Sequence, residues 1–177
     1  MPTKYISAQD TAKIIRRILK ESFPGIKFSV RSKVYAGGAS INVDWADGPT
    51  REQVGMLVGK FEGATFDGMT DYKDYVYREI NGEKVHFCAD FIFKNRSYSN
   101  AAYDGALKSV CTRGRIPLIT MDDIEKSGMS EWFRPVPNLG DDLQRLTLKE
   151  LHCTSFCHAK HSATLVTYFP DFCQKAA

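Results

Sequence analysis

The stretch KFSVRSKVYAGGASINVDW, residues 27–45, decides the fold. On both sides of Ala36-Gly37-Gly38, apolar side chains alternate with polar or charged ones. A period of two around a glycine turn is typical of a β-hairpin that buries one face. This register predicts that Ile41, Val43 and Trp45 are buried, and the cations of the first strand then face solvent.

Helices are predicted before and after this hairpin in the sequence. Residues 8–22 carry apolar side chains at helical spacing, with Ser7 or Asp10 available as the N-cap. Residues 50–60 form a second amphipathic segment. Residues 61–74 are rich in glycine, acidic and aromatic residues, and we expect an irregular loop there.

A second hairpin is predicted around Asn81-Gly82, a dipeptide that strongly favours a two-residue turn. Residues 75–80 and 83–94 flank this turn, and residues 99–112 follow as a third helix. The order α-β-β-α-β-β-α predicts an α+β fold. Its sheet would be largely antiparallel, with about four strands in two hairpins and with helices packed on one face.

The character of the sequence changes after Arg113-Gly114-Arg115. We expect a first domain over residues 1–115 and a mixed C-terminal extension over residues 116–177, whose autonomy the pattern leaves open. Within the extension, short helices are expected at 121–128 and 141–151, and a strand at 161–169.

Composition predicts a soluble protein of the cytoplasm that does not contact membranes. The N-terminal segment carries charges where a secretion signal needs an apolar core. No apolar run approaches the ~20 residues of a membrane span. Five cysteines, an odd number without a signal, favour reduced thiols.

Charge is unevenly distributed, although the net charge is only +3. Residues 1–34 hold eight Lys and Arg against two acidic residues, whereas residues 35–150 hold fourteen against eighteen. The basic segment favours an anionic partner and the acidic segment a basic one. A merely solvated surface is the alternative, because polar faces are charged in most proteins.

The predicted hairpin gathers cations on one face. Lys27, Arg31 and Lys33 share it with Tyr35, so the ribbon could contact phosphates while the tyrosine stacks on a base. Four further cations are expected to extend this surface: Arg16, Arg17, Lys94 and Arg96. Because helix 8–22 must pack on the opposite face, its two arginines can join only around an edge of the sheet. A polar outer face without a partner is the alternative.

Residues 152–161, HCTSFCHAKH, bring thiols and imidazoles together. If this segment is helical, Cys153, Cys157 and His161 share one face, and either Cys173 or His158 could complete four zinc ligands. The spacing matches no standard zinc finger, and no third group orients a Cys–His pair for catalysis. We therefore expect no bound metal or cofactor and no enzymatic activity, with the thiols packed as small apolar groups.

Three segments carry a resemblance to a known family: FPGIKFSVRSKVYAGGASINVDWADGPT (residues 23–50), FEGATFDGMTDYKDY (residues 61–75) and ADFIFKNRSYS (residues 89–99). Over about residues 8–98 the chain resembles one of the large polyvalent protein associated domains, the twenty-ninth of that series. The resemblance implies a protein of a phage or conjugative element, of the kind thought to enter a recipient cell with the DNA and to help establish or protect it. It implies no catalytic residues, because none is assigned to the family.

From this context we expect a non-enzymatic mobile-element protein that binds and inhibits a host defence complex, of anti-CRISPR or anti-restriction type, in the bacterial cytoplasm. Its partner would be that complex or its nucleic acid, because occlusion needs only a complementary surface. The alternative is a nucleic-acid-binding accessory protein for transfer or establishment of the element. Its binding to DNA or RNA would weaken steeply with salt.

Overall fold

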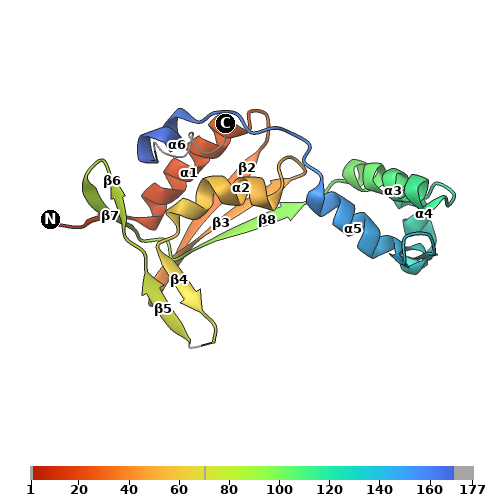
Figure 1. Ribbon diagram of the computed structural model, residues 1–177, viewed down its shortest axis with the longest axis horizontal. Coiled ribbons are helices and arrows are strands. Elements are labelled where there is room, and N and C mark those ends of the chain that lie inside the picture. The colour runs from red at the N-terminus through yellow and green to blue at the C-terminus, as the bar shows by residue number, and fades with distance from the viewer. Residues whose placement is uncertain (1, 70, 170–177) are drawn as a thin grey trace. The chain divides into compact units, whose positions relative to one another are not determined.

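The computed structural model describes residues 2–69 and 71–169, which form two units. Unit 1 combines the chain up to Arg96 with the segment from Cys157 onward, and unit 2 contains Ser97–Phe156. The colours of Figure 1 show how the chain is shared between the units: the blue α6 lies in the same unit as the red α1.

Unit 1 contains both strands and helices. Its elements are β1 (Lys4–Ile6), α1 (Ala8–Ser22), β2 (Phe28–Tyr35), β3 (Gly38–Ala46), α2 (Arg51–Val58), a 3-10 helix (Gly59–Phe61), β4 (Ala64–Asp67), β5 (Tyr72–Tyr75), β6 (Arg78–Ile80), β7 (Glu83–Phe87), β8 (Phe91–Ser97) and α6 (Ala163–Tyr168). The strands pair mostly antiparallel, and with the helices they confirm the predicted α+β class.

The first helix has the predicted bounds. α1 begins at Ala8 because the hydroxyl of Ser7 accepts the backbone N–H of Asp10 at 3.1 Å. Its apolar stripe, which includes Ile15 and Leu19, is fully buried in the core of unit 1.

The first hairpin has the predicted register. Phe28 of β2 lies opposite Trp45 of β3, and Val30 lies opposite Val43. Trp45 is only 3% exposed, and its indole N–H donates to the carbonyl of Pro49 at 3.0 Å. The alternation therefore identified the buried face correctly.

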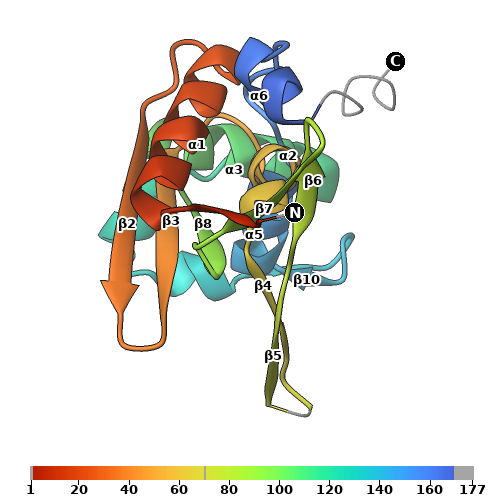
Figure 2. The ribbon, with the colours of Figure 1, turned by 90° about the vertical axis from the view of Figure 1, so that its left-hand side faces the viewer.

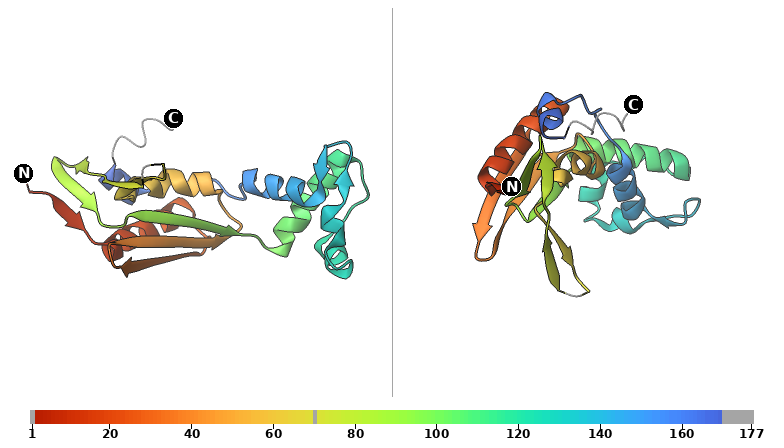
Figure 3. Two further views of the ribbon diagram at one scale, coloured as in Figure 1. Left: turned by 90° about the horizontal axis from the view of Figure 1, so that it is seen from below. Right: turned by 60° about the vertical axis from the view of Figure 1, so that its left-hand side comes forward.

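Two helices cover that buried face. β8 lies beside β3, which gives a three-stranded sheet in the order β2-β3-β8. α1 packs over β2 and β3, and α2 lies over β8, where the backbone of Gly55 faces the side chain of Lys94. Figure 3 (left) looks onto the opposite face of this sheet, with α1 behind the strands. Helix packing on one face of the sheet is thus confirmed.

The strands of unit 1 are divided among separate sheets, so the single four-stranded sheet that we expected is wrong. The hairpin around Asn81-Gly82 forms β6 and β7, which belong to a second sheet in the order β1-β7-β6. β1 pairs with β7 in parallel, with Tyr5 opposite His86. The predicted strand 83–94 is interrupted after Phe87, and its two parts, β7 and β8, enter different sheets.

Two segments differ from their predicted structure. Residues 61–74, expected as a loop, contain the antiparallel strands β4 and β5, which project from unit 1 (Figure 2). Residues 161–169, expected as a strand, contain α6, which begins where the hydroxyl of Ser162 accepts the N–H of Leu165 at 3.1 Å. Its β-branched and aromatic residues favour a strand locally, but burial of Leu165 in the core of unit 1 favours the helix.

Unit 2 packs its helices around its own core. Its elements are α3 (Asn100–Gly114), α4 (Met121–Lys126), a 3-10 helix (Ser130–Phe133), β9 (Pro135–Val136), β10 (Asp141–Asp142) and α5 (Leu143–Cys153). Ser99, Thr120 and Asp142 cap the three α-helices through their side-chain oxygens. Across both units, no helix in the described ranges is long and apolar enough to cross a membrane.

These units divide the chain differently from the predicted domains 1–115 and 116–177. α3 packs with α4 and α5, because Leu107 shares one core with Ile124 and Leu143. α6, by contrast, packs in unit 1. The division into a first domain over residues 1–115 and an extension over residues 116–177 stays a prediction.

Candidate functional site

The face of the β2-β3-β8 sheet opposite α1 and α2 is called the outer face. β2 places three exposed side chains there, Arg31, Lys33 and Tyr35, as the alternation predicts. Lys27 is also exposed, one residue before β2. The predicted exposure of these cations is therefore confirmed.

β3 and β8 complete the outer face. Asp44 of β3 accepts a hydrogen bond from the Asn95 amide of β8 at 2.9 Å and lies 3.8 Å from the guanidinium of Arg31. Because side chains alternate along a strand, Phe91 and Phe93 lie on the same face of β8 as Asn95. Their ring centroids are 6.3 Å apart, and Phe93 is 50% exposed.

Aromatic rings, cations and amides thus lie together on a rigid sheet. Unpaired bases can stack on Tyr35 and Phe93, while Arg31 and Lys33 contact phosphates. Asp44 offsets part of the positive charge, but an ion pair as exposed as Arg31–Asp44 is weak and can be exchanged for a phosphate. Such a surface suits a single strand, because the bases of a duplex are already stacked on one another.

A buried carboxylate fixes the end of the sheet where β2 turns into β3. Asp90 accepts the backbone N–H of Ala39 at 3.1 Å, and the ammonium of Lys73 in β5 lies 2.8 Å from it. These contacts raise the pKa of Lys73, chiefly through its hydrogen bond to Asp90. A Cβ at Gly38 would overlap this carboxylate and crowd the ring of Tyr35, so a glycine is required there.

The two arginines of α1 do not lie on the outer face. Arg16 reaches the edge strand instead, and its guanidinium donates to the carbonyl of Val30 at 2.6 Å. Arg17 forms an ion pair with Glu21 at 3.1 Å within α1. Arg16 therefore contacts the sheet at its β2 edge.

Lys94 and Arg96 were expected to extend the basic surface, but their side chains do not lie on the outer face. Both alternate with Phe93 and Asn95 on β8 and therefore face the helices. Lys94 lies 3.5 Å from the carboxylate of Glu62. Arg96 is only 6% exposed and donates to the carbonyls of Asp47 and Gly48 at 2.8 and 3.1 Å, so it holds the loop after β3.

Sequence reasoning missed the aromatic residues of β8. Phe91, Phe93 and Asn95 alternate with Ile92, and this period of two carries the required signal. Lys94 and Arg96 were instead assigned to the basic surface without placing each residue of this strand on a face. The outer face therefore contains aromatic rings in addition to the predicted cations.

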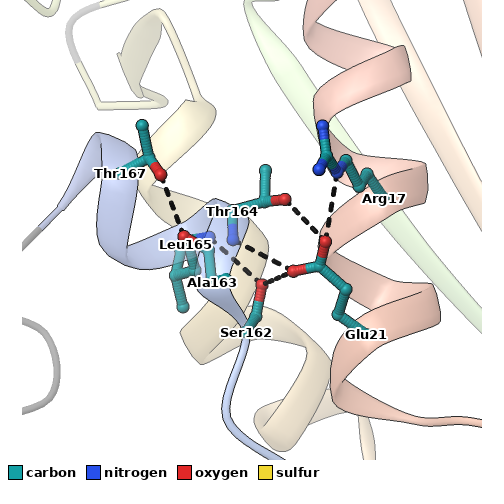
Figure 4. A network of polar contacts seen from close by, with 7 residues as sticks. All are labelled: Arg17, Glu21, Ser162, Ala163, Thr164, Leu165 and Thr167. Atoms are coloured by element: carbon teal, nitrogen blue, oxygen red, sulfur yellow. Dashed lines mark hydrogen bonds and ion pairs between the residues drawn. The ribbon is translucent and has the colours of Figure 1, made fainter.

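A second polar network joins α1 to α6 (Figure 4). The Glu21 carboxylate accepts hydrogen bonds from the Ser162 hydroxyl at 2.8 Å and from both the backbone N–H and the hydroxyl of Thr164, at 3.0 and 2.7 Å. The backbone N–H of Thr164 contributes most to lowering the pKa of Glu21, to about 2. This network positions α6.

The thiols among the described residues do not form the arrangement that a zinc site requires. α5 ends at Cys153, so Cys157 and His161 do not continue its face. Cys173 lies outside the described residues. Within residues 2–69 and 71–169, no three His, Cys, Asp or Glu side chains come together in a way that could hold a metal ion. Cys157 instead packs against the core of unit 1, and burial raises the pKa of its thiol.

Comparison with known proteins places the chain in a family. No curated protein and no solved structure matches it. The family model of large polyvalent protein associated domain 29 matches residues 6–99. The match runs from the last residue of β1 through β8 and so includes every strand of the outer face. The family occurs in proteins of phages and other mobile elements. Since more than half of its length matches, this chain belongs to the large polyvalent protein associated domain 29 family.

Proposed function

We propose that this chain is a non-enzymatic nucleic-acid-binding protein of a mobile element, which holds a single strand on the outer face. The observation that supports the proposal most directly is the composition of that face. Arg31, Lys33 and Tyr35 of β2 lie on the same side of the sheet as Phe91 and Phe93 of β8. A sheet of this kind offers stacking and phosphate contacts with little rearrangement, because its strands are already rigid.

The proposal favours the accessory role over the inhibitory one. The +3 net charge of the chain is modest, so affinity must come from stacking as well as from phosphate contacts. Each base stacked on an aromatic ring contributes about 1–3 kcal/mol, which is comparable to the electrostatic contribution of a few cations. A protein that travels with transferred DNA encounters single strands, which suits this combination.

Charge reversal on the outer face tests the proposal. The triple variant K27E/R31E/K33E reverses the two cations of β2 and Lys27 just before it, and it should fold normally because exposed charges contribute little to stability. Its affinity for a fluorescent oligothymidylate should fall at least about tenfold, with a shallower dependence on salt. The matched control K20E/K108E/K126E changes the net charge equally at exposed positions on α1 and in unit 2, which are not part of this face. Equal loss of affinity in both variants, or no binding by the unmodified protein, would reject the proposal.

The inhibition of a host defence complex is the second candidate, and the β4–β5 hairpin favours it. One face of this projecting ribbon carries Asp67 and Asp74 beside Tyr72, all exposed. Acidic and aromatic side chains can occupy the basic groove of a nucleic-acid-processing enzyme. Tagged protein and its D67K/D74K variant can be used to capture partners from a host lysate treated with nuclease. A defence protein captured only by the unmodified protein would support this candidate, and recovery of nucleic acid alone would count against it.

A further inference from the structure

Three tyrosines surround one buried imidazole beside the outer face. The ring centroids of Tyr5, Tyr75 and Tyr77 lie 5.6, 5.6 and 5.2 Å from that of His86. His86 is only 6% exposed, and its Nδ1 lies 3.0 Å from the carbonyl of Val76. The imidazole therefore supports the three phenol rings from the inside. These four residues are called the tyrosine cluster.

The phenol rings themselves remain accessible. Tyr5, Tyr75 and Tyr77 are 64, 55 and 45% exposed. They come from β1, from β5 and from the link between β5 and β6, which are brought together by the pairing of β1 with β7. Exposed rings held in place by a buried support lose little conformational freedom when they bind a flat ligand.

Two lysines border the cluster. The ammonium of Lys84 lies 4.4 Å from the ring centroid of Tyr77, and that of Lys73 lies 5.0 Å from the ring centroid of Tyr75. Lys73 is already paired with Asp90. The cluster is thus suited to stacking, with few cations left to neutralise phosphates.

Lys73 also connects the cluster to the outer face. Its ammonium lies 3.4 Å from the carbonyl of Gly37, in the turn between β2 and β3. The Asp90 carboxylate that it contacts lies against Gly38, beside the ring of Tyr35. Tyr35, Lys73 and Tyr75 therefore follow one another from the end of β2 to the base of the β4–β5 hairpin.

We infer that the tyrosine cluster is a second stacking site, on which a single nucleic-acid strand continues after leaving the outer face at Tyr35. This inference rests on the proposed function and adds the path of the strand. Bases of any sequence stack on phenol rings, because every base has a π-face. The strand is single, because its bases must be unpaired to reach these rings.

The path predicts a dependence on strand length. An oligothymidylate of about 5 nucleotides is long enough to occupy the outer face alone, whereas one of about 15 nucleotides also reaches the cluster. The Y75L/Y77L variant keeps apolar bulk but removes two phenol rings. Its affinity for the long strand should fall about 5- to 100-fold, to that for the short strand, and the salt dependence should not change.

A matched control is available on the same hairpin. Tyr72 is 61% exposed, but it pairs with Asp67 on the opposite face of the ribbon from Lys73 and Tyr75. The Y72L variant should therefore bind both strands as the unmodified protein does. Undiminished binding of the long strand by Y75L/Y77L would overturn the inference while leaving the proposed function intact. Failure of the unmodified protein to bind either strand would remove both.

Photo-crosslinking of the unmodified protein makes the test independent of how the variants fold. A long oligonucleotide carrying iodouracil at successive positions is irradiated with the full chain, and the crosslinked peptides are identified by mass spectrometry. Crosslinks to Tyr75 or Tyr77 from one end of the strand, and to Tyr35 or Phe93 from the other, are expected. Crosslinks confined to the residues of the outer face at every position would overturn the inference.

Discussion

The carboxylate of Glu21 in α1 accepts two hydrogen bonds from Thr164 in α6, one from the backbone N–H at 3.0 Å and one from the hydroxyl at 2.7 Å. The two residues are separated by 143 positions in the sequence. Their contact joins the beginning of the family domain to a helix beyond the matched region, residues 6–99. The core of unit 1 is therefore completed by a segment that the family match does not include.

Acid should weaken this junction. The pKa of Glu21 falls from 4.5 to about 2 in the folded chain, so its contribution to stability is fully present above about pH 4.5 and is lost as the pH falls towards 2. The E21Q variant should lose about 2 kcal/mol at neutral pH, because the amide cannot accept the same set of charge-assisted hydrogen bonds. Chemical denaturation between pH 2 and pH 7 measures both effects.

The E83Q variant is the control, since Glu83 pairs with Lys4 where both side chains are more than 60% exposed. A loss in E21Q no larger than that in E83Q would contradict the prediction.

Substitution of Gly63, which lies two residues after the 3-10 helix, should lower the free energy of unfolding. A Cβ there would overlap the carbonyl of Phe87, and the backbone cannot move easily because Gly63 also bonds to Ala89 and Val76, each at 2.8 Å. We expect G63A to lose about 1–3 kcal/mol of unfolding free energy. Gly59 has helical backbone angles and open space around its Cβ position, so G59A should be neutral or gain about 0.4–1 kcal/mol. Thermal and urea unfolding measure the stabilities of G63A and G59A. Equal stabilities would show that the close approach of Gly63 to the carbonyl of Phe87 is unimportant.

Removal of the Asp90 carboxylate should destabilise the turn between β2 and β3. In D90A the backbone N–H of Ala39 loses its acceptor, and the ammonium of Lys73 loses its partner at 2.8 Å. We expect a loss of about 2–4 kcal/mol, reduced from the value for a fully buried pair because the Lys73 side chain is 25% exposed. A double-mutant cycle with K73M measures the coupling between the two residues. Additive effects in that cycle would mean that the ion pair contributes nothing of its own.

The four described cysteines should react with iodoacetamide in a definite order. Cys153 is exposed and should be alkylated first. Burial raises the pKa of both Cys88 and Cys157, which lowers the thiolate fraction at neutral pH, so these two should follow. Cys111, 2% exposed, should react only when unit 2 unfolds. Peptide mapping after timed quenching follows each site, and the prediction fails if Cys157 reacts as fast as Cys153.

Local signals explain why much of the fold could be predicted. The alternation over residues 27–45 fixes the β2–β3 register, and the cap at Ser7 fixes the start of α1. β1 could not be found in this way, because its three residues are held by parallel pairing with β7, about 80 positions away. α6 was missed because its local propensity opposes its tertiary contacts with Glu21 and the core.

The residues of the candidate site also divide into those with a local sequence signal and those that depend on distant contacts. Arg31, Lys33 and Tyr35 follow from the period of two within one strand. The ring of Phe93 carried a comparable signal, but it lies on a strand whose position beside β3 the sequence does not specify. The tyrosine cluster has no sequence signal at all, since Tyr5 and Tyr75 meet only through His86.

Insertion of unit 2 between β8 and α6 also determines the order in which the chain can fold as it is synthesised. Most of unit 1 leaves the ribosome first, yet Phe61 at its centre lacks the packing of Tyr168 and Phe169 until α6 has emerged. Unit 2 is continuous and mainly helical, so its contacts are local and form quickly once residues 97–156 are outside the ribosome. Unit 2 therefore folds before unit 1 is complete. Until then, the part of the unit 1 core around Phe61 remains incomplete and open to chaperones and proteases.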